Sequence, residues 1–178
     1  LAGKAAFVAG PHCNIYNLPT LQWLSALGVQ RWVIPLEMGA ADLAILQAGR
    51  PAGVQTEVFA YGRMPLAFSA RCFTARHNNL PKDDCQFRCI DHPDGLLLRT
   101  REQEGFLVLN GIQTQSAKVY NLLPEVAQLR ALGMDVLRIS PQCAHTGEIV
   151  ALFRAVVDDT LAAADANAKL QPLMPAQG

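Results

Sequence analysis

The sequence has no excess of charge of either sign, no long apolar run and no low-complexity tract. Its 15 basic residues balance its 15 acidic residues, so net charge gives no long-range attraction to nucleic acid or to an anionic membrane. No apolar stretch reaches the roughly 18 residues that a membrane span needs, and the N-terminus lacks the pattern of a secretion signal. We therefore expect a cytoplasmic protein without a membrane span.

The cysteine pattern of a disulfide-stabilised secreted domain is also missing. The 178 residues contain five cysteines, an odd number, and three of these are clustered rather than spread along the chain. Hydrophobic residues make up 51% of the sequence, which is enough for one domain with a substantial buried core. This combination favours a folded protein in a reducing compartment and argues against disorder.

What the sequence does contain is an alternation of short β-type runs and longer helical patterns. We predict strands at residues 5–9, 31–37, 56–61, 105–109 and 135–140. We predict a first helix that has Pro19 in its first turn and ends at Gly28, and further helices over 40–48, over 126–132 and over 147–163. Gly62 is predicted to end the third strand, and Asn110-Gly111 is predicted to form a hairpin turn. Such an alternation builds a parallel sheet, because a crossover helix must return each strand to the same edge.

Five strand-like segments fall short of the eight that close a (β/α) barrel of about 250 residues. Either further βα units lie upstream, or the fold is a smaller open sheet. The abrupt start at Leu1, directly before an apolar strand, favours missing units. We predict an α/β fold, an incomplete TIM-like barrel over residues 1–165, with a cysteine-containing insertion at about 63–100 and a flexible tail over 166–178.

The insertion holds Cys72, Cys85 and Cys89 and has no regular periodicity. A loop with few apolar residues gains order when a metal ties its distant points together. Basic side chains nearby favour thiolates and offset their charge, and the sequence supplies Arg71, Arg76, Lys82 and Arg88. The pattern therefore indicates a metal site, with three incidental surface thiols as the plainer alternative.

The spacing of the cysteines does not identify the metal. Zinc could bind the three sulfurs together with His77 or His92, whereas an iron–sulfur cluster needs a fourth ligand, commonly a cysteine. Cys13 and Cys143 each follow a predicted strand, so either could substitute, although an ordinary small buried side chain is the plainer interpretation of both.

Polar side chains follow the first three predicted strands. His12 and Asn17 come after the first strand, Glu37 ends the second, and Arg63 follows the third. Because the carboxyl ends of barrel strands meet at one face, we predict that these four side chains contribute to one pocket. The alternative role for each is capping of a loop or a helix.

Several motifs of the sequence resemble the collagenase-like peptidase superfamily, and within it the branch that acts in anaerobic ubiquinone biosynthesis. They are Asn14, Tyr16-Asn17, Pro35 to Glu37, Glu57 to Arg76, Pro81 to Cys85, Cys89, Val108 to Thr114, Val119 to Leu122 and Arg138 to Gln142. The resemblance implies a barrel-like fold and a 4Fe–4S cluster bound by Cys72, Cys85 and Cys89. It places the fourth ligand, another cysteine, upstream of this segment.

The same resemblance implies an iron–sulfur subunit of an oxygen-independent hydroxylase that acts on lipid-tailed ubiquinone precursors and pairs with a UbiU-like sister protein as a heterodimer. Two alternatives stay open: hydroxylation of an RNA base, as in sister members of the superfamily, and a zinc-stabilised scaffold without catalysis. The neutral charge argues against RNA. Peptidase activity is not expected, because the sequence has no Gly-x-Ser-x-Gly or His-Glu-x-x-His motif.

Overall fold

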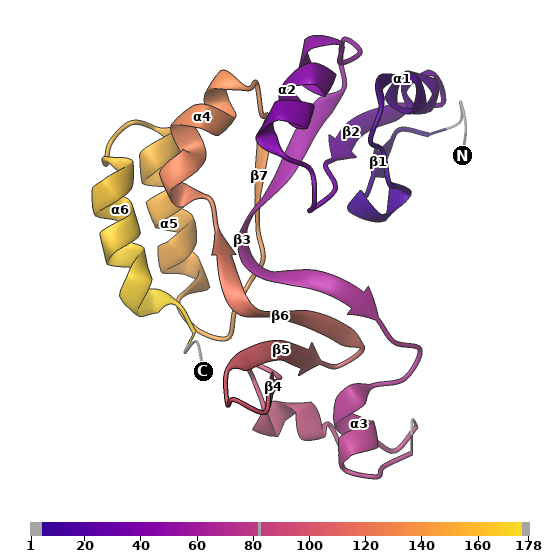
Figure 1. The fold of residues 1–178 in the computed structure, drawn as a ribbon, viewed down its shortest axis with the longest axis vertical. Helices are drawn as coiled ribbons and strands as arrows, with labels where there is room; N and C mark the ends of the chain where they lie inside the picture. The colour runs from indigo at the N-terminus through magenta and orange to yellow at the C-terminus, as the bar shows by residue number, and fades with distance from the viewer. Residues whose placement is uncertain (1–4, 82, 176–178) are drawn as a thin grey trace. The chain divides into compact units, whose positions relative to one another are not determined.

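The computed structural model describes residues 5–81 and 83–175 (Figure 1). The chain divides into two compact units. The first unit is built from the residues up to Ala60 together with Pro124–Ile139. The second is built from Tyr61–Leu123 together with the residues from Ser140 onward. Among the described residues, no helix is both long and apolar enough to cross a membrane.

The first unit is an α/β layer whose strands β1, β2 and β3 are parallel, with β7 pairing on the other side of β3. Helix α1 returns the chain from β1 to β2, and α2 returns it from β2 to β3. Its elements are β1 (Phe7–Ala9), η1 (Pro11–Cys13), α1 (Leu18–Ala26), β2 (Val29–Val33), α2 (Ala40–Ala48), the first part of β3 (Gln55–Phe68), α4 (Val126–Ala131) and β7 (Val136–Ile139).

Local signals explain the helices of this unit. Asn17 caps α1, since its Oδ1 accepts a hydrogen bond of 2.9 Å from the amide of Thr20, and Pro19 occupies the first turn. Helix α2 covers the predicted residues 40–48, and Gly49 follows it as the C-cap. The core beneath includes Leu21 and Trp32, both with no exposed surface.

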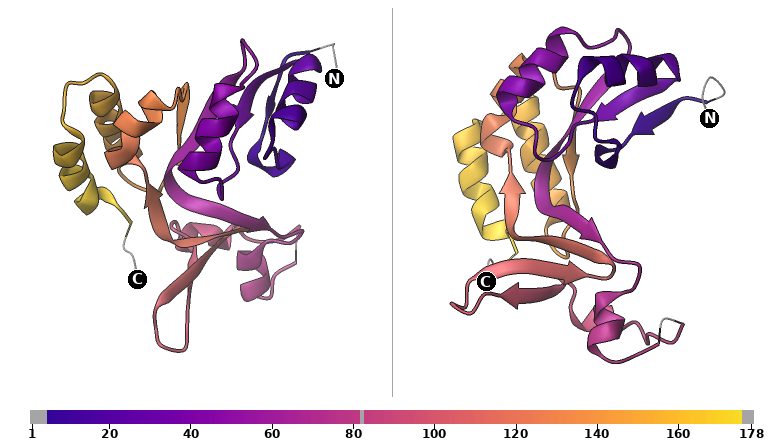
Figure 2. Two further views of the ribbon diagram at one scale, coloured as in Figure 1. Left: turned by 45° about the horizontal axis from the view of Figure 1, so that its top comes forward. Right: turned by 45° about the vertical axis from the view of Figure 1, so that its right-hand side comes forward.

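The second unit is an antiparallel sheet with two helices at its C-terminal end. The later part of β3 pairs with β6, β6 with β5 and β5 with β4, all antiparallel. Helices α5 and α6 lie side by side in every view (Figure 1, Figure 2). Its remaining elements are α3 (Phe73–His77), η2 (Arg88–Asp91), β4 (Leu96–Arg99), β5 (Gly105–Asn110), β6 (Gln113–Asn121), the first residue of η3 (Leu123–Glu125), α5 (Thr146–Val157), α6 (Ala163–Leu170) and η4 (Gln171–Leu173).

The α/β class is confirmed, and the strands form a mostly open sheet. The predicted hairpin is also confirmed, because Asn110 pairs with Gln113 across a turn in which Gly111 has a φ of +59°. The turn residues therefore fix the register between β5 and β6.

The prediction that Gly62 ends the third strand is wrong, because β3 continues to Phe68. Gly62 has a φ of +125°, a conformation that glycine adopts without steric cost, and it still pairs with Tyr120 of β6. The glycine therefore changes the course of the backbone inside a strand, where its type alone suggested a break.

The predicted tail over 166–178 is wrong for its first part, which belongs to α6 and η4. Ala166 and Leu170 lie four positions apart and have no exposed surface, so the helix is anchored by one apolar face. Helix α5 ends at Val157, earlier than predicted, and Asp159 just beyond it has a φ of +55°. Residues 176–178 lie outside the described residues.

Candidate functional site

The cysteine segment, residues 72–81 and 83–95, leads from β3 to β4 in the second unit. Cys72 is the N-cap of α3, Cys89 lies in η2, and the backbone oxygen of Cys85 accepts a hydrogen bond of 3.4 Å from the amide of Arg88. Helices α3 and η2 contact each other. All three thiols are free; Cys72 and Cys85 are half-buried and Cys89 is exposed.

The three sulfurs do not converge in this structure. Over residues 5–81 and 83–175, no group of three or more cysteine, histidine, aspartate or glutamate side chains is gathered as a metal ion would require. The donor chemistry nevertheless fits an iron–sulfur cluster, since three free thiols within one segment, at the N-cap of α3, in the loop before η2 and in η2, could supply three of its four usual ligands. The assignment of Cys72, Cys85 and Cys89 as metal ligands stays a prediction.

Two of the four positive charges expected beside these thiols, Arg71 and Arg88, have partners in the structure. Arg88 pairs with Asp91 at 3.6 Å on the surface of η2, and the guanidinium of Arg71 donates to the backbone oxygen of Leu80 at 3.4 Å. Lys82 lies outside the described residues. The two histidines considered as zinc ligands flank the same elements: His77 is the last residue of α3, and His92 follows η2.

A cavity of about 280 Å³ in the second unit adjoins this segment. Its wall includes Arg63 of β3, Asp94 of the cysteine segment, Asn110 and Gln115 of the hairpin, and Gln142 and Cys143 from the loop after β7. Arg63 is held by the backbone, because its Nη1 donates to the carbonyl oxygens of Ser116, at 3.3 Å, and Ala117. Burial lowers the pKa of Arg63, while the charge of Asp94 acts in the opposite direction.

Tyr61 lies next to this cavity with no exposed surface. Its hydroxyl donates to Oε1 of Gln142 at 2.8 Å, and its ring meets Phe153 edge to face with 6.0 Å between the ring centres. Gln142 is fixed in turn, since its amide donates to the backbone oxygens of Ala144 and Leu173. Burial raises the pKa of Tyr61 to about 12, although the positive charge of Arg63 partly opposes that rise.

The buried phenol predicts a loss of stability at alkaline pH. A tyrosine in the unfolded chain ionises near pH 10, whereas Tyr61 in the folded protein stays protonated to about pH 12. Above pH 10 the unfolded state therefore binds fewer protons, and the free energy of unfolding should fall by about 2 kcal/mol as the pH rises towards 12. Urea unfolding of the wild type and of Tyr61→Phe between pH 8 and 12 measures this contribution. Parallel pH profiles of the two proteins would contradict it.

A second concavity, the Tyr16–Glu37 groove, lies in the first unit and has a volume of about 640 Å³. Tyr16 and Asn17 reach it from the loop after β1, and Glu37 reaches it from the loop after β2. The other lining residues are Leu18, Pro19, Met38, Asp42, Ile45 and Leu46. The hydroxyl of Tyr16 donates to Oε2 of Glu37 at 3.4 Å, and partial desolvation together with this carboxylate raises the pKa of Tyr16.

The structure brings together two of the four residues that we predict for one pocket. Asn17 and Glu37 line the Tyr16–Glu37 groove, and Asn17 also has the alternative role of helix capping. His12 lies in η1 and is not among the lining residues, whereas Arg63 lines the cavity of the second unit. Tyr16 also lines the groove, but it was not among the residues predicted for the pocket. Its position between the first strand and the helix-capping Asn17 could have indicated it.

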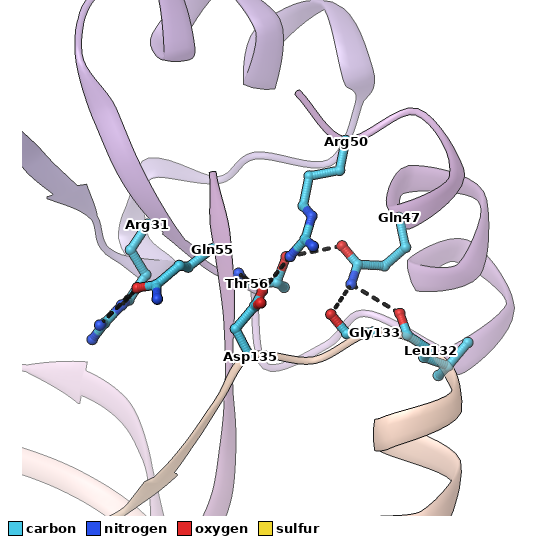
Figure 3. Close-up of polar contacts among 8 residues, drawn as sticks. All are labelled: Arg31, Gln47, Arg50, Gln55, Thr56, Leu132, Gly133 and Asp135. Atoms are coloured by element: carbon cyan, nitrogen blue, oxygen red, sulfur yellow. Dashed lines mark hydrogen bonds and ion pairs between the residues drawn. The ribbon is translucent and has the colours of Figure 1, made fainter. Parts of the chain in front are cut away.

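Two polar networks hold the first unit together rather than forming a site. At the amino ends of β3 and β7, Asp135 joins Arg50 and Thr56, and Gln47 links Thr56 to the end of α4 (Figure 3). In the second network, the buried carboxylate of Glu57 pairs with Arg31 at 3.2 Å and with Arg138. Ion pairs with one buried partner fix the arrangement of strands more than they add stability.

Comparison with known proteins gives a family but no fold template. Two curated relatives are both called tRNA hydroxylation protein P, from Helicobacter pylori strains ATCC 700392 / 26695 and J99 / ATCC 700824. The first is 27% identical over 179 residues, covering 88% of this chain and 41% of the relative. The second is 27% identical over 161 residues, covering 82% and 37%.

The chain thus spans about two fifths of the length of these relatives. No solved structure matches it. The family model described as peptidase family U32 matches residues 3–176, which is nearly the whole sequence. This match shows that the chain belongs to peptidase family U32.

Proposed function

We propose that this chain is part of an oxygen-independent hydroxylase that acts in the cytoplasm on lipid-tailed ubiquinone precursors, as UbiV-like proteins do. The observation that carries the proposal is the set of free cysteines, Cys72, Cys85 and Cys89, within motifs that resemble that branch of family U32. These cysteines would bind a 4Fe–4S cluster together with a fourth cysteine upstream. The cluster supplies one-electron redox chemistry when bound.

The fold supports this proposal in two respects. The parallel strands β1, β2 and β3, with β7 paired to β3, are what a segment of a larger (β/α) barrel would contribute, so we propose that additional strands complete the barrel in the full-length protein. The cysteine segment follows the end of β3, beyond the part that pairs antiparallel with β6, and barrel enzymes place their functional groups on the segments that follow strands. A UbiU-like sister protein is the proposed partner.

A second candidate function is hydroxylation of a tRNA base. Two relatives named tRNA hydroxylation protein P favour it, at 27% identity over about two fifths of their length. The charge of this chain favours the ubiquinone precursor instead, since its 15 basic and 15 acidic residues provide no excess to neutralise phosphates. Binding of tRNA that weakens steeply with added salt, together with loss of a tRNA modification in a deletion strain, would decide for RNA.

We expect the full-length protein, purified without oxygen together with its partner, to contain about four irons and four sulfides per chain. Cys72→Ser, Cys85→Ser and Cys89→Ser should each lower the iron content several-fold, because each change removes one thiolate ligand. Cys143→Ser is the matched control: Cys143 is also free, but it lies outside the cysteine segment and should keep the full iron content. Chemical iron and sulfide analysis with a visible absorption spectrum provides the measurement.

Two outcomes would redirect the proposal. Zinc at one ion per chain, without iron or visible absorption, would make the cysteine segment a structural zinc site and support the scaffold alternative. A strain that lacks the gene but makes normal amounts of ubiquinone without oxygen would refute the metabolic role. Restoration of ubiquinone by the wild-type gene, and not by Cys85→Ser, is the expected result.

A further inference from the structure

We propose that the Tyr16–Glu37 groove binds a neutral apolar molecule that carries a phenolic hydroxyl. The identification of this molecule with a ubiquinone precursor rests on the proposed function, whereas the binding of the phenol class does not. The groove lies where β1 and β2 end, between the start of α1 and the first turns of α2. In α/β folds with parallel strands, ligands bind at this carboxyl end.

The size and the lining of the Tyr16–Glu37 groove suit a small apolar ligand. A volume of about 640 Å³ falls within the roughly 300–1,000 Å³ of small-molecule pockets. Five apolar side chains line the groove: Leu18, Pro19, Met38, Ile45 and Leu46. Ile45 is 66% exposed although it sits in a concave wall, so it offers apolar surface that a ligand can cover.

The polar groups of the groove define the head group of the ligand. Glu37 and Asp42 provide carboxylate acceptors, and no lysine, arginine or histidine is among the described residues that line it. A phosphate or carboxylate would therefore meet like charge without a counter-ion. The ligand must instead donate a hydrogen bond to a carboxylate, which is a stronger bond than one between neutral groups.

A phenol suits these carboxylates better than a cation does. Asp42 lies in the first turn of α2, where the positive end of the helix dipole offsets part of its charge. Glu37 already accepts a hydrogen bond from a phenol, the hydroxyl of Tyr16, at a long 3.4 Å. A ligand hydroxyl can share this carboxylate, and the Tyr16 ring stands beside it as an aromatic wall, 48% exposed.

The test uses 4-hexylphenol as the probe and the full-length protein, titrated by calorimetry. Its methyl ether, 4-hexylanisole, has the same apolar body without the donor and should bind at least about tenfold more weakly. Glu37→Gln should weaken binding of the phenol by a similar factor and leave binding of the ether unchanged, because only the phenol uses the carboxylate. Equal affinity for phenol and ether would overturn the assigned head group.

A matched pair of surface variants tests whether the Tyr16–Glu37 groove is the binding site. Ile45→Lys fills the groove with a charged side chain and should weaken 4-hexylphenol binding at least about tenfold. Val150→Lys makes the same kind of change at another exposed helical position, on α5, and should leave affinity unchanged. Equal effects of the two variants, or tighter binding of hexylammonium than of 4-hexylphenol, would overturn the proposal.

Failure of this inference is distinguishable from failure of the proposed function. If Ile45→Lys keeps its iron and its phenol affinity equals that of the wild type, the groove is not the site, and the hydroxylase role is unaffected. If 4-hexylphenol binds as expected but a deletion strain makes normal ubiquinone, the groove is a phenol site and the metabolic role is wrong. Loss of ubiquinone in an Ile45→Lys strain with normal iron content would support both.

Discussion

Replacing Asp135 by alanine is expected to lower the free energy of unfolding by about 2 kcal/mol. The Asp135 carboxylate accepts a hydrogen bond of 2.8 Å from the amide of Thr56, a residue with no exposed surface, and it pairs with Arg50 (Figure 3). Alanine leaves the buried amide and the guanidinium without this acceptor. Urea unfolding of both proteins, monitored by circular dichroism, gives the difference.

Asp158→Ala is the matched control for that change. Asp158 contacts Arg154 at 3.8 Å on the exposed surface of α5, in an i,i+4 arrangement, so its removal should lower the free energy of unfolding by less than about 0.5 kcal/mol. If both aspartates had the same small effect, the network at the amino ends of β3 and β7 would not hold the first unit together. This network joins residues 85 positions apart in the chain.

Trp32→Ala should have the largest effect of any single change to the core of the first unit, about 4 kcal/mol. The side chain of Trp32 is fully buried in β2, and alanine would leave a cavity that the surrounding strands cannot close. Trp32→Phe should cost less than about 1.5 kcal/mol, because the indole Nε1 is buried without a hydrogen-bond partner among the described residues. Phenylalanine keeps most of the apolar contact and removes this donor.

Trp23→Ala tests whether the stability lost on replacing a tryptophan depends on how deeply that tryptophan is buried. Trp23 is 62% exposed on α1, and its loss should change the free energy of unfolding by less than about 0.5 kcal/mol. Chemical denaturation of the three tryptophan variants ranks them directly. A loss for Trp32→Phe as large as that for Trp32→Ala would contradict the absence of a hydrogen-bond partner for the indole Nε1 among the described residues.

Elements with strong local signals were predictable from sequence. Helix α2 occupies the predicted residues 40–48 because Gly49 follows a run of good helix formers, and the β5–β6 hairpin follows from Asn110-Gly111. The alternation of strands and helices correctly gave the α/β class. In each case the deciding interactions lie within a few residues of one another.

Features set by distant parts of the chain were not predictable. Strand β3 continues through Gly62 because β6 pairs with it there. Helix α6 is stabilised because the side chains of Ala166 and Leu170 are buried. The predicted pocket also depended on tertiary structure: Asn17 and Glu37 share a groove, while Arg63 lines a different cavity. Spacing identified the cysteine segment, but it cannot specify how closely the three sulfurs approach.

The division of the chain has a consequence for synthesis on the ribosome. The first unit is completed by Pro124–Ile139, which the ribosome makes only after the whole of Tyr61–Leu123. Until then β3 lacks β7 on one side and Thr56 lacks Asp135, so a nascent chain exposes an unpaired strand edge. A premature stop codon ahead of Asp135 therefore leaves both units incomplete, and such a product should be a target for chaperones and proteases.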